Sequence, residues 1–236
     1  MKQEYADELL KENLKGYNLI VEHFSATRNR VWPEIKFLFE KYIKPNDKIL
    51  DLGCGNGRFY EVIKNYTENY IGVDNCKSLI GIAREKYPYA DFKTADAFNL
   101  PFSENCFDKI YSIAVLHHIP SKRLRLKFLK EIKRVLKPKG LCVLTVWKAR
   151  EKRLRSSLLK FTLLKLLFLS KLDFKDIFLP WKESKDNVRF NRYYHFFSKK
   201  ELVDLFREAG FSVKNAGTVR NEKGNRHNIY IIAEKV

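Results

Sequence analysis

The chain has 236 residues, 45% of them hydrophobic, and its 46 Lys and Arg against 28 Asp and Glu give a formal net charge of +18. This length and apolar content predict one decorated α/β domain with a full core, and the charged N-terminus excludes a signal peptide. Four scattered cysteines, without a Cys-x-x-Cys pair or zinc-type His spacing, predict a cytoplasmic protein with reduced thiols and no metal. The charge favours a polyanionic partner, with nucleic acid ahead of a merely basic surface.

Predicted strands and helices alternate along the chain. Residues 1–45 are predicted to form a helical extension, broken near Ser25 and at Pro33. Strands are predicted at about 48–52, 69–74, 91–95, 107–113, 140–146, 211–218 and 227–234, mostly with helices between them. This order predicts a doubly wound, seven-stranded Rossmann-like sheet within a single domain, 1–236. The last strand follows its predecessor without a helix, so we expect it to be antiparallel.

The first predicted strand ends in a glycine-rich turn, Asp51-Leu52-Gly53-Cys54-Gly55-Asn56-Gly57. A dinucleotide fingerprint needs Gly-x-Gly-x-x-Gly, but the last position is Arg58 in one register and Tyr60 in the other. An ordinary turn needs one such glycine, so three favour a ligand lying against bare backbone. The pattern resembles the Asp-x-Gly-x-Gly-x-Gly of class I methyltransferases, which implies S-adenosylmethionine as cofactor.

Further acids follow the next strands. Asp74 ends the second strand, roughly 20 residues past the glycines, where a carboxylate can bind ribose hydroxyls. Asp96 follows the third strand, and in the resembling family the acid at this position contacts the adenine amino group. A strand-end Asp is often only a helix N-cap, but three acids in order favour a site. The predicted cofactor residues are Asp51, Gly53, Cys54, Gly55, Asn56, Gly57, Asp74, Asn75, Asp96, Ala97, Ile113 and Val115.

A strongly basic segment runs from Ser121 to Gly140, with Glu131 its lone acid. Its apolar residues have helical spacing, which predicts one amphipathic helix that ends at Pro138 and Gly140 and presents a basic face to RNA. Asn225 and Arg226, in the last predicted hairpin, either touch RNA or form a plain turn.

A basic, Leu-rich insertion at 148–176 interrupts the alternation after the fifth strand. It is too short and too often charged to span a membrane. Its position beside the carboxyl edge of the sheet favours a lid over the active site, and the alternative is an amphipathic helix on a membrane surface.

Segments outside the predicted sheet indicate a narrower family than the glycine turn does. They are Tyr17-Asn18, His23-Phe24-Ser25, Thr27-Arg28, Trp32-Pro33, His117-His118, Phe178 to Trp181, and Arg192-Tyr193-Tyr194-His195. Together they resemble the tRNA wobble-uridine carboxymethyl methyltransferases, from about Tyr17 to the C-terminus. The resemblance implies a tRNA anticodon-loop substrate and methylation of the carboxylate of 5-carboxymethyluridine, which needs no general base because it is already ionised.

The same resemblance suggests the residues that meet the substrate. They are Arg28, Trp32, His117, Arg192, Tyr193 and Tyr194, with His195 a weaker candidate. Two arginines can hold a carboxylate or phosphate, and aromatic rings can stack on an extruded base. Tyr193 and Tyr194 point to opposite faces if extended, so one at most should face the substrate.

Relatives of this family bind a small zinc-ribbon activator at the third-strand edge. Here Tyr87, Tyr89 and Phe92 would form an apolar edge for such pairing, whereas Lys93 is a charge that protects a free edge. Two other functions stay open. One is methylation of a small or lipid-like acceptor such as a quinone precursor, and the other is a non-catalytic RNA-binding protein on a methyltransferase fold.

Overall fold

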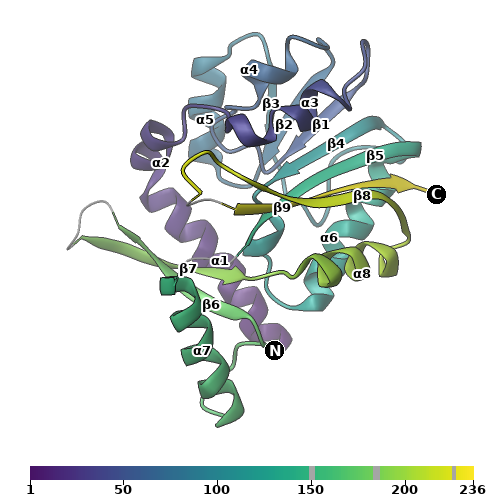
Figure 1. The fold of residues 1–236 in the computed structure, drawn as a ribbon. Helices are drawn as coiled ribbons and strands as arrows, with labels where there is room; N and C mark the ends of the chain where they lie inside the picture. The colour runs from purple at the N-terminus through teal and green to yellow at the C-terminus, as the bar shows by residue number, and fades with distance from the viewer. Residues whose placement is uncertain (149–151, 183–186, 225–226) are drawn as a thin grey trace.

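The strand order of the main sheet sets the position of the site. The computed structural model describes residues 1–148, 152–182, 187–224 and 227–236 (Figure 1). The seven-stranded sheet has the order β3-β2-β1-β4-β5-β9-β8. Its strands are β1 (Ile49–Leu52), β2 (Tyr70–Asp74), β3 (Asp91–Thr94), β4 (Phe107–Ile113), β5 (Leu136–Trp147), β8 (Phe211–Arg220) and β9 (His227–Lys235).

The strand order reverses at β1, which pairs in parallel with both β2 and β4. The last strand, β9, lies between β5 and β8 and is antiparallel to both. The predicted doubly wound sheet with an antiparallel last strand is therefore confirmed. In such sheets the carboxyl ends of the strands on either side of the reversal leave a crevice for ligands.

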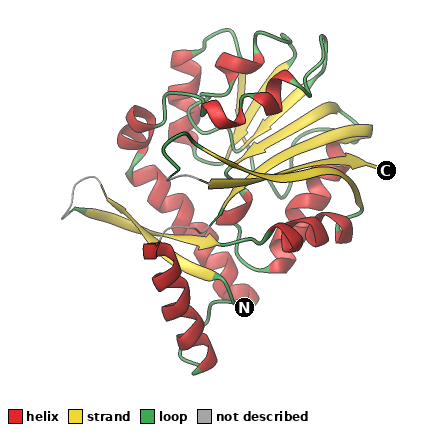
Figure 2. Cartoon of the chain, viewed as in Figure 1, coloured by secondary structure: helices red, strands yellow, loops and turns green. Residues whose placement is uncertain are grey.

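Helices cover both faces of the sheet (Figure 2). The helices that the structure describes are α1 (Gln3–Leu19), α2 (Val21–Thr27), η1 (Pro33–Ile35), α3 (Phe37–Glu40), α4 (Tyr60–Ile63), α5 (Lys77–Lys86), η2 (Leu116–His118), α6 (Lys122–Val135), α7 (Lys152–Leu166) and α8 (Lys199–Glu208). Alternate strand residues enter two apolar clusters, because successive side chains point to opposite faces. Ile110 packs with α6 and α8, while its neighbour Tyr111 packs with α3, α4 and α5.

The end of α6 corrects one expectation. The helix stops at Val135, short of the predicted end at Pro138 and Gly140, and β5 begins at once with Leu136. Leu136 already pairs with Phe107 of β4, and a residue before a proline is disfavoured in a helix. Sheet pairing and Pro138 together end the helix early.

A second sheet was not anticipated from the sequence. Residues between β5 and α8 form a hairpin of β6 (Asp176–Lys182) and β7 (Val188–His195), in which Leu179 lies opposite Arg192. Helix α7 precedes the hairpin and packs on it, with the Phe161 and Phe178 ring centroids 6.0 Å apart. Pro180 obscures this strand in the sequence, because proline is rare inside strands.

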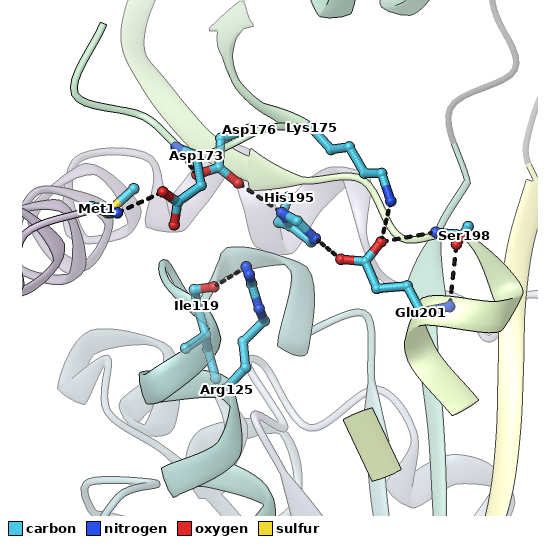
Figure 3. A network of polar contacts seen from close by, with 9 residues as sticks. All are labelled: Met1, Ile119, Arg125, Asp173, Lys175, Asp176, His195, Ser198 and Glu201. Carbon is cyan, nitrogen blue, oxygen red and sulfur yellow. Dashed lines mark hydrogen bonds and ion pairs between the residues drawn. The ribbon is translucent and has the colours of Figure 1, made fainter. Parts of the chain in front are cut away.

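A buried polar network joins the hairpin base to α8 (Figure 3). Both ring nitrogens of His195 are 2.7 Å from a carboxylate, Nδ1 from Asp176 and Nε2 from Glu201. Burial disfavours the ionised form of Glu201, yet its hydrogen bonds with His195 and Lys175 lower its pKa to about 2. The network gives His195 a structural role, so its weak candidacy as a catalytic residue is not supported. Among the described residues, no helix is long and apolar enough to cross a bilayer.

Candidate active site

A cavity opens at the carboxyl ends of β1, β2 and β4, and residues of α1, α2 and the β6–β7 hairpin complete its lining. On the sheet side it is lined by Gly53, Cys54, Gly55, Asn56, Asp74, Asn75, Asp96, Ala97, Ile113, Ala114 and Val115. The rest of the lining is richer in aromatic and basic side chains: Asn13, Tyr17, Phe24, Arg28, Trp32, His117, His118, Trp147, Trp181, Arg192 and Tyr194. One cavity therefore has two chemically different halves.

The glycine turn is built to bring backbone close to a ligand. Gly53, Gly55 and Gly57 all have positive φ, a conformation that disfavours a side chain. A Cβ at Gly53 would lie 2.3 Å from a methyl carbon of Val115, so no other residue fits there without displacement. The backbone N–H groups of Gly53 and Cys54 both donate to the Val73 carbonyl of β2, at 2.7 and 3.0 Å.

Asp74 ties the turn to the end of β2. One of its carboxylate oxygens accepts from the Gly55 N–H and the other from the Cys76 N–H, each at 2.9 Å. Burial raises the pKa of Asp74, while these backbone donors oppose the rise. Each carboxylate oxygen retains acceptor capacity for a ligand hydroxyl pair. Asp96 lines the same half, where its side chain accepts from the Phe98 N–H at 2.9 Å.

Two predicted cofactor residues do not line the cavity. They are Asp51 and Gly57, and Asp51 is buried near the end of β1, where the Tyr70 hydroxyl donates to it at 3.0 Å. The second oxygen of Asp51 has no hydrogen-bond partner among the described residues. Burial raises the pKa of this carboxyl from 3.8 to about 7, and the nearby Arg58 opposes the rise.

Asp51 should therefore make the stability of the unliganded protein depend on pH. Between about pH 4 and about pH 7, the folded state holds a proton that the unfolded chain has released, so the free energy of unfolding falls as pH rises. The Asp51→Asn variant should lack this component. Chemical denaturation of both proteins would measure this: the free energy of unfolding of the variant should rise relative to that of the wild type up to about pH 7. Parallel curves would contradict the assignment.

The other half of the cavity brings two arginines to one indole ring. The Cζ atom of Arg28 lies 5.1 Å from the Trp181 ring centroid, and that of Arg192 lies 4.6 Å from it. The Trp181 Nε1–H donates to Nδ1 of His23 at 3.0 Å, which fixes the ring. Arg28 comes from the end of α2 and Arg192 from β7, so the hairpin is what unites them. Two guanidinium groups in one cavity favour a planar anion.

His117 adds a neutral donor to this half. Its ring stacks on Tyr194 with a centroid separation of 5.0 Å, and its Nδ1 accepts from the Trp147 backbone N–H at 3.4 Å. Burial, together with the positive charge of Arg192, holds the pKa of His117 well below its usual range. The acceptor role of Nδ1 places the remaining proton on Nε2, which is buried and without a hydrogen-bond partner among the described residues. A neutral N–H donor of this kind suits a carbonyl or carboxylate oxygen.

A chain of hydrogen bonds fixes the opposite wall. The Tyr193 carbonyl can only accept, so the contact of 3.2 Å with His118 Nδ1 places that ring's proton there. His118 Nε2 then accepts from the Tyr17 hydroxyl at 2.9 Å. Burial raises the pKa of the Tyr17 hydroxyl, and the nearby positive charge of Arg192 opposes that rise. Burial lowers the pKa of His118 to about 3, so the chain keeps this polarity at neutral pH.

The structure separates the predicted acceptor residues. It brings Arg28, Trp32, His117, Arg192 and Tyr194 to the cavity and leaves Tyr193 outside. As extended backbone requires, Tyr193 points to the other face of β7, where it packs with Leu9 and Leu172, so the prediction that Tyr193 meets the substrate is wrong. Several lining residues were not among the predicted site residues: Tyr17, Phe24, His118, Trp147 and Trp181. Ala114, with φ of 63°, was also missed, and no sequence pattern signals it.

Two surface expectations change as well. No described residue of the predicted lid, the insertion 148–176, lines the cavity, whereas the hairpin contributes Trp181, Arg192 and Tyr194 to its lining. On α6, Arg134 is committed to Glu131 and to the carbonyls of Leu100 and Phe102, and Lys133 donates to the Gly210 carbonyl. Much of the predicted basic face therefore holds the fold together. Asn225 and Arg226 lie outside the described residues.

Comparisons with known proteins agree with this geometry. A family model described as "Methyltransferase domain" matches residues 50–144. The tRNA (carboxymethyluridine(34)-5-O)-methyltransferase of Schizosaccharomyces pombe is 30% identical, and the alignment covers 100% of both chains. The enzyme of that name from Arabidopsis thaliana is 39% identical over 57% of this chain, which spans 32% of that relative.

Solved structures share the fold. An S-adenosylmethionine-dependent methyltransferase of Methanosarcina mazei gives a TM-score of 0.72 at 24% identity, covering 88% of this chain and 99% of that one. A Haloferax volcanii methyltransferase, solved in complex with the Trm112 methyltransferase activator, gives 0.69 at 15% identity, covering 94% and 97%.

Proposed function

Because the chain belongs to the S-adenosylmethionine-dependent methyltransferases, in the family of the tRNA (carboxymethyluridine(34)-5-O)-methyltransferases, we propose that it methylates a carboxylate on the wobble uridine of tRNA. The observation that carries this proposal is the pair of guanidinium groups that share Trp181 inside the cavity. The product would be a methyl ester.

Both halves of the cavity fit their ligands. S-adenosylmethionine supplies an electrophilic methyl group when it is bound. The bare backbone of the glycine turn suits its amino acid portion, and Asp74 and Asp96 suit its ribose and adenine. Facing them, Arg28 and Arg192 would hold the substrate carboxylate, while Tyr194 offers a ring for a base to stack on.

The protonation states favour an acceptor that is already ionised. The pKa of His117 and that of His118 are both lowered by burial, so neither ring is a good base for an amine or a phenol at neutral pH. A carboxylate needs no base, because one of its oxygens takes the methyl group without losing a proton. The residues of this chain then have to orient the carboxylate and exclude water.

A matched pair of RNA substrates tests the proposal. The protein would be incubated with S-adenosylmethionine and tRNA carrying either 5-carboxymethyluridine or the neutral 5-carbamoylmethyluridine, and the nucleosides would be identified after digestion. A base-labile methyl ester from the first substrate alone is the expected result. Methylation of the amide, or of another nucleoside, would overturn the proposal. The alternative of a lipid-like acceptor loses its main support, since the described residues of the apolar insertion lie away from the cavity.

The assay would be run with and without a zinc-ribbon activator. β3 is an edge strand, and we propose that such a partner, if needed, adds a strand there. Tyr89 is 98% exposed at this edge, whereas Tyr87 and Phe92 are buried in the core, so the predicted three-residue apolar edge is wrong. Lys93 forms an ion pair of 3.0 Å with Asp91. Cytoplasmic location stays a prediction.

Asp74 should separate cofactor binding from RNA binding. Asp74→Ala removes the carboxylate that we propose for the ribose, and we expect cofactor affinity to fall by about tenfold or more, the effect of one or two charge-assisted hydrogen bonds. Calorimetry would measure cofactor affinity and filter binding would measure tRNA affinity, which should be unchanged. Equal losses of both would make Asp74 a structural residue, because it also holds the Gly55 and Cys76 N–H groups.

A further inference from the structure

Helix α7 and the turn that follows it carry most of the large apolar side chains that the described surface exposes. Six of the ten large hydrophobic residues that are exposed among the described residues belong to this segment: Leu159, Leu163, Leu166, Leu167, Phe168 and Leu169. The helix already buries its other face, because Leu158 and Phe161 pack against the hairpin. Its lower end projects beyond the rest of the molecule (Figure 1). Apolar patches of this kind mark interaction surfaces.

The exposed leucines lie along one side of the helix. Leu159, Leu163, Leu166 and Leu167 follow the i, i+4, i+7, i+8 spacing of a single face. Along the described side chains of the helix and turn, residues 156–172, there is no acid and there are three basic residues: Lys160 and Lys171 are exposed, and Lys165 is half-buried. The surface is therefore apolar and cationic together.

The turn after α7 holds an aromatic residue in a strained conformation. Phe168 has φ of 59°, and the N–H of Leu169 donates to the Leu164 carbonyl at 2.9 Å, which is the helix-ending pattern that normally places glycine here. A bulky residue with positive φ is a true outlier, and such strain tends to mark functional sites. Phe168 is 96% exposed at the projecting end, so packing within the chain does not explain it.

We propose that the exposed side of α7, with Phe168 at its tip, binds the surface of an anionic lipid bilayer. The basic residues match the headgroup charge, while leucines and a phenylalanine enter the acyl boundary. A nucleic acid backbone could pair with the basic residues, but its phosphates would offer no apolar contact to the leucines. A second copy of the chain would bring an equally basic helix to the contact, so charge opposes self-association. A projecting convex end suits lipid, which moulds around an inserted side chain, better than a folded protein.

Vesicle binding by the full chain tests this surface. Sedimentation with phosphatidylcholine vesicles, with and without phosphatidylserine, should show binding to the anionic vesicles and little to the neutral ones. The Leu163→Gln/Leu167→Gln double variant should reduce the binding by about tenfold or more, since it removes two leucines from the apolar contact. Tyr89→Gln changes an equally exposed aromatic residue elsewhere and should bind as the wild type does.

A second variant distinguishes a loss of vesicle binding from a loss of folding. Phe168→Gly relieves the positive φ, so the melting temperature should stay the same or rise while vesicle binding falls. Absence of wild-type binding, or equal binding by the wild type and both variants, would overturn the proposal. Concentration-dependent dimerisation that the same variants abolish would assign the surface to a second copy instead. None of these readouts depends on methyl transfer.

Discussion

Replacing Arg192 by Met is expected to lower kcat/KM for the carboxylate-bearing tRNA by about a hundredfold or more, the scale of losing one preorganised charged donor in an active site. Arg192 is 9% exposed, and its Cζ atom lies 4.6 Å from the Trp181 ring centroid and 5.1 Å from that of Tyr194. Two rings therefore hold a guanidinium whose remaining direction is the cavity. Cofactor affinity should change by less than about threefold, because the cofactor half lies across the space.

Controls distinguish orientation of the substrate from loss of charge. Arg189→Gln removes the same charge from an exposed position on the same strand, outside the cavity lining, and should leave kcat/KM near the wild-type value. Arg192→Lys should not rescue activity, since an ammonium lacks the planar pair of donors. A similar loss in cofactor affinity would show that Arg192 only supports the fold.

Arg28 is expected to hold the same substrate carboxylate as Arg192. Arg28→Ala should lower turnover on the carboxylate acceptor while cofactor affinity is kept, and the double variant with Arg192→Met should lose less than the sum of the single losses. Two groups that grip one carboxylate act as a unit, so non-additivity is the signature of a shared ligand. Full additivity would mean that the arginines bind different groups.

The glycine turn and the sheet are the parts that local sequence determines. Three glycines at alternate positions after an apolar strand leave few conformations, and the structure gives all three positive φ. The antiparallel last strand was predicted because only a loop separates β9 from β8. Both features depend on neighbours along the chain, which is why a single sequence reveals them.

The acceptor half depends on contacts between distant segments. Trp181 and Arg192 reach the cavity through a hairpin that carries Pro180, and their partners come from α1 and α2. Tyr193 and Tyr194 differ in role solely because of which face of β7 packs on Leu9 and Leu172. Pairing across about 160 residues leaves no local pattern, so the sequence identified the residue types here but could not assign their orientation.

For the basic helix α6, too, the sequence reveals the residue types but not the contacts of their charged side chains. Composition indicates that α6 is rich in Lys and Arg, but it does not show how many of them are committed within the protein. Arg125 is buried and donates to the Ile119 carbonyl, and Lys137, just past the helix in β5, pairs with Asp108 at 2.8 Å. Net charge therefore predicts a polyanionic partner better than it predicts the face that binds it.

Tyr17→Phe is expected to lower kcat/KM by about tenfold or more, with cofactor affinity kept, the scale of losing a hydrogen bond to a charged group. The ring remains packed, with centroids 5.7 Å from Phe24 and 5.5 Å from His118, so only the hydroxyl is lost. That hydroxyl donates to His118 Nε2, and its pKa, which burial raises, is lowered by the nearby Arg192. Tyr17 is thus a positioning residue, acting through Arg192.

A mutant cycle tests this coupling. If Tyr17 acts by orienting Arg192, Tyr17→Phe should have little further effect in the Arg192→Met background. Tyr5→Phe, a change on the same helix outside the cavity lining, should leave activity near the wild-type value. Independent losses in the cycle would show that the Tyr17 hydroxyl touches the substrate itself. Because tRNA with the neutral carbamoylmethyl group should not be methylated, its control is the same cycle measured on tRNA affinity, which should show no coupling when no anion is held.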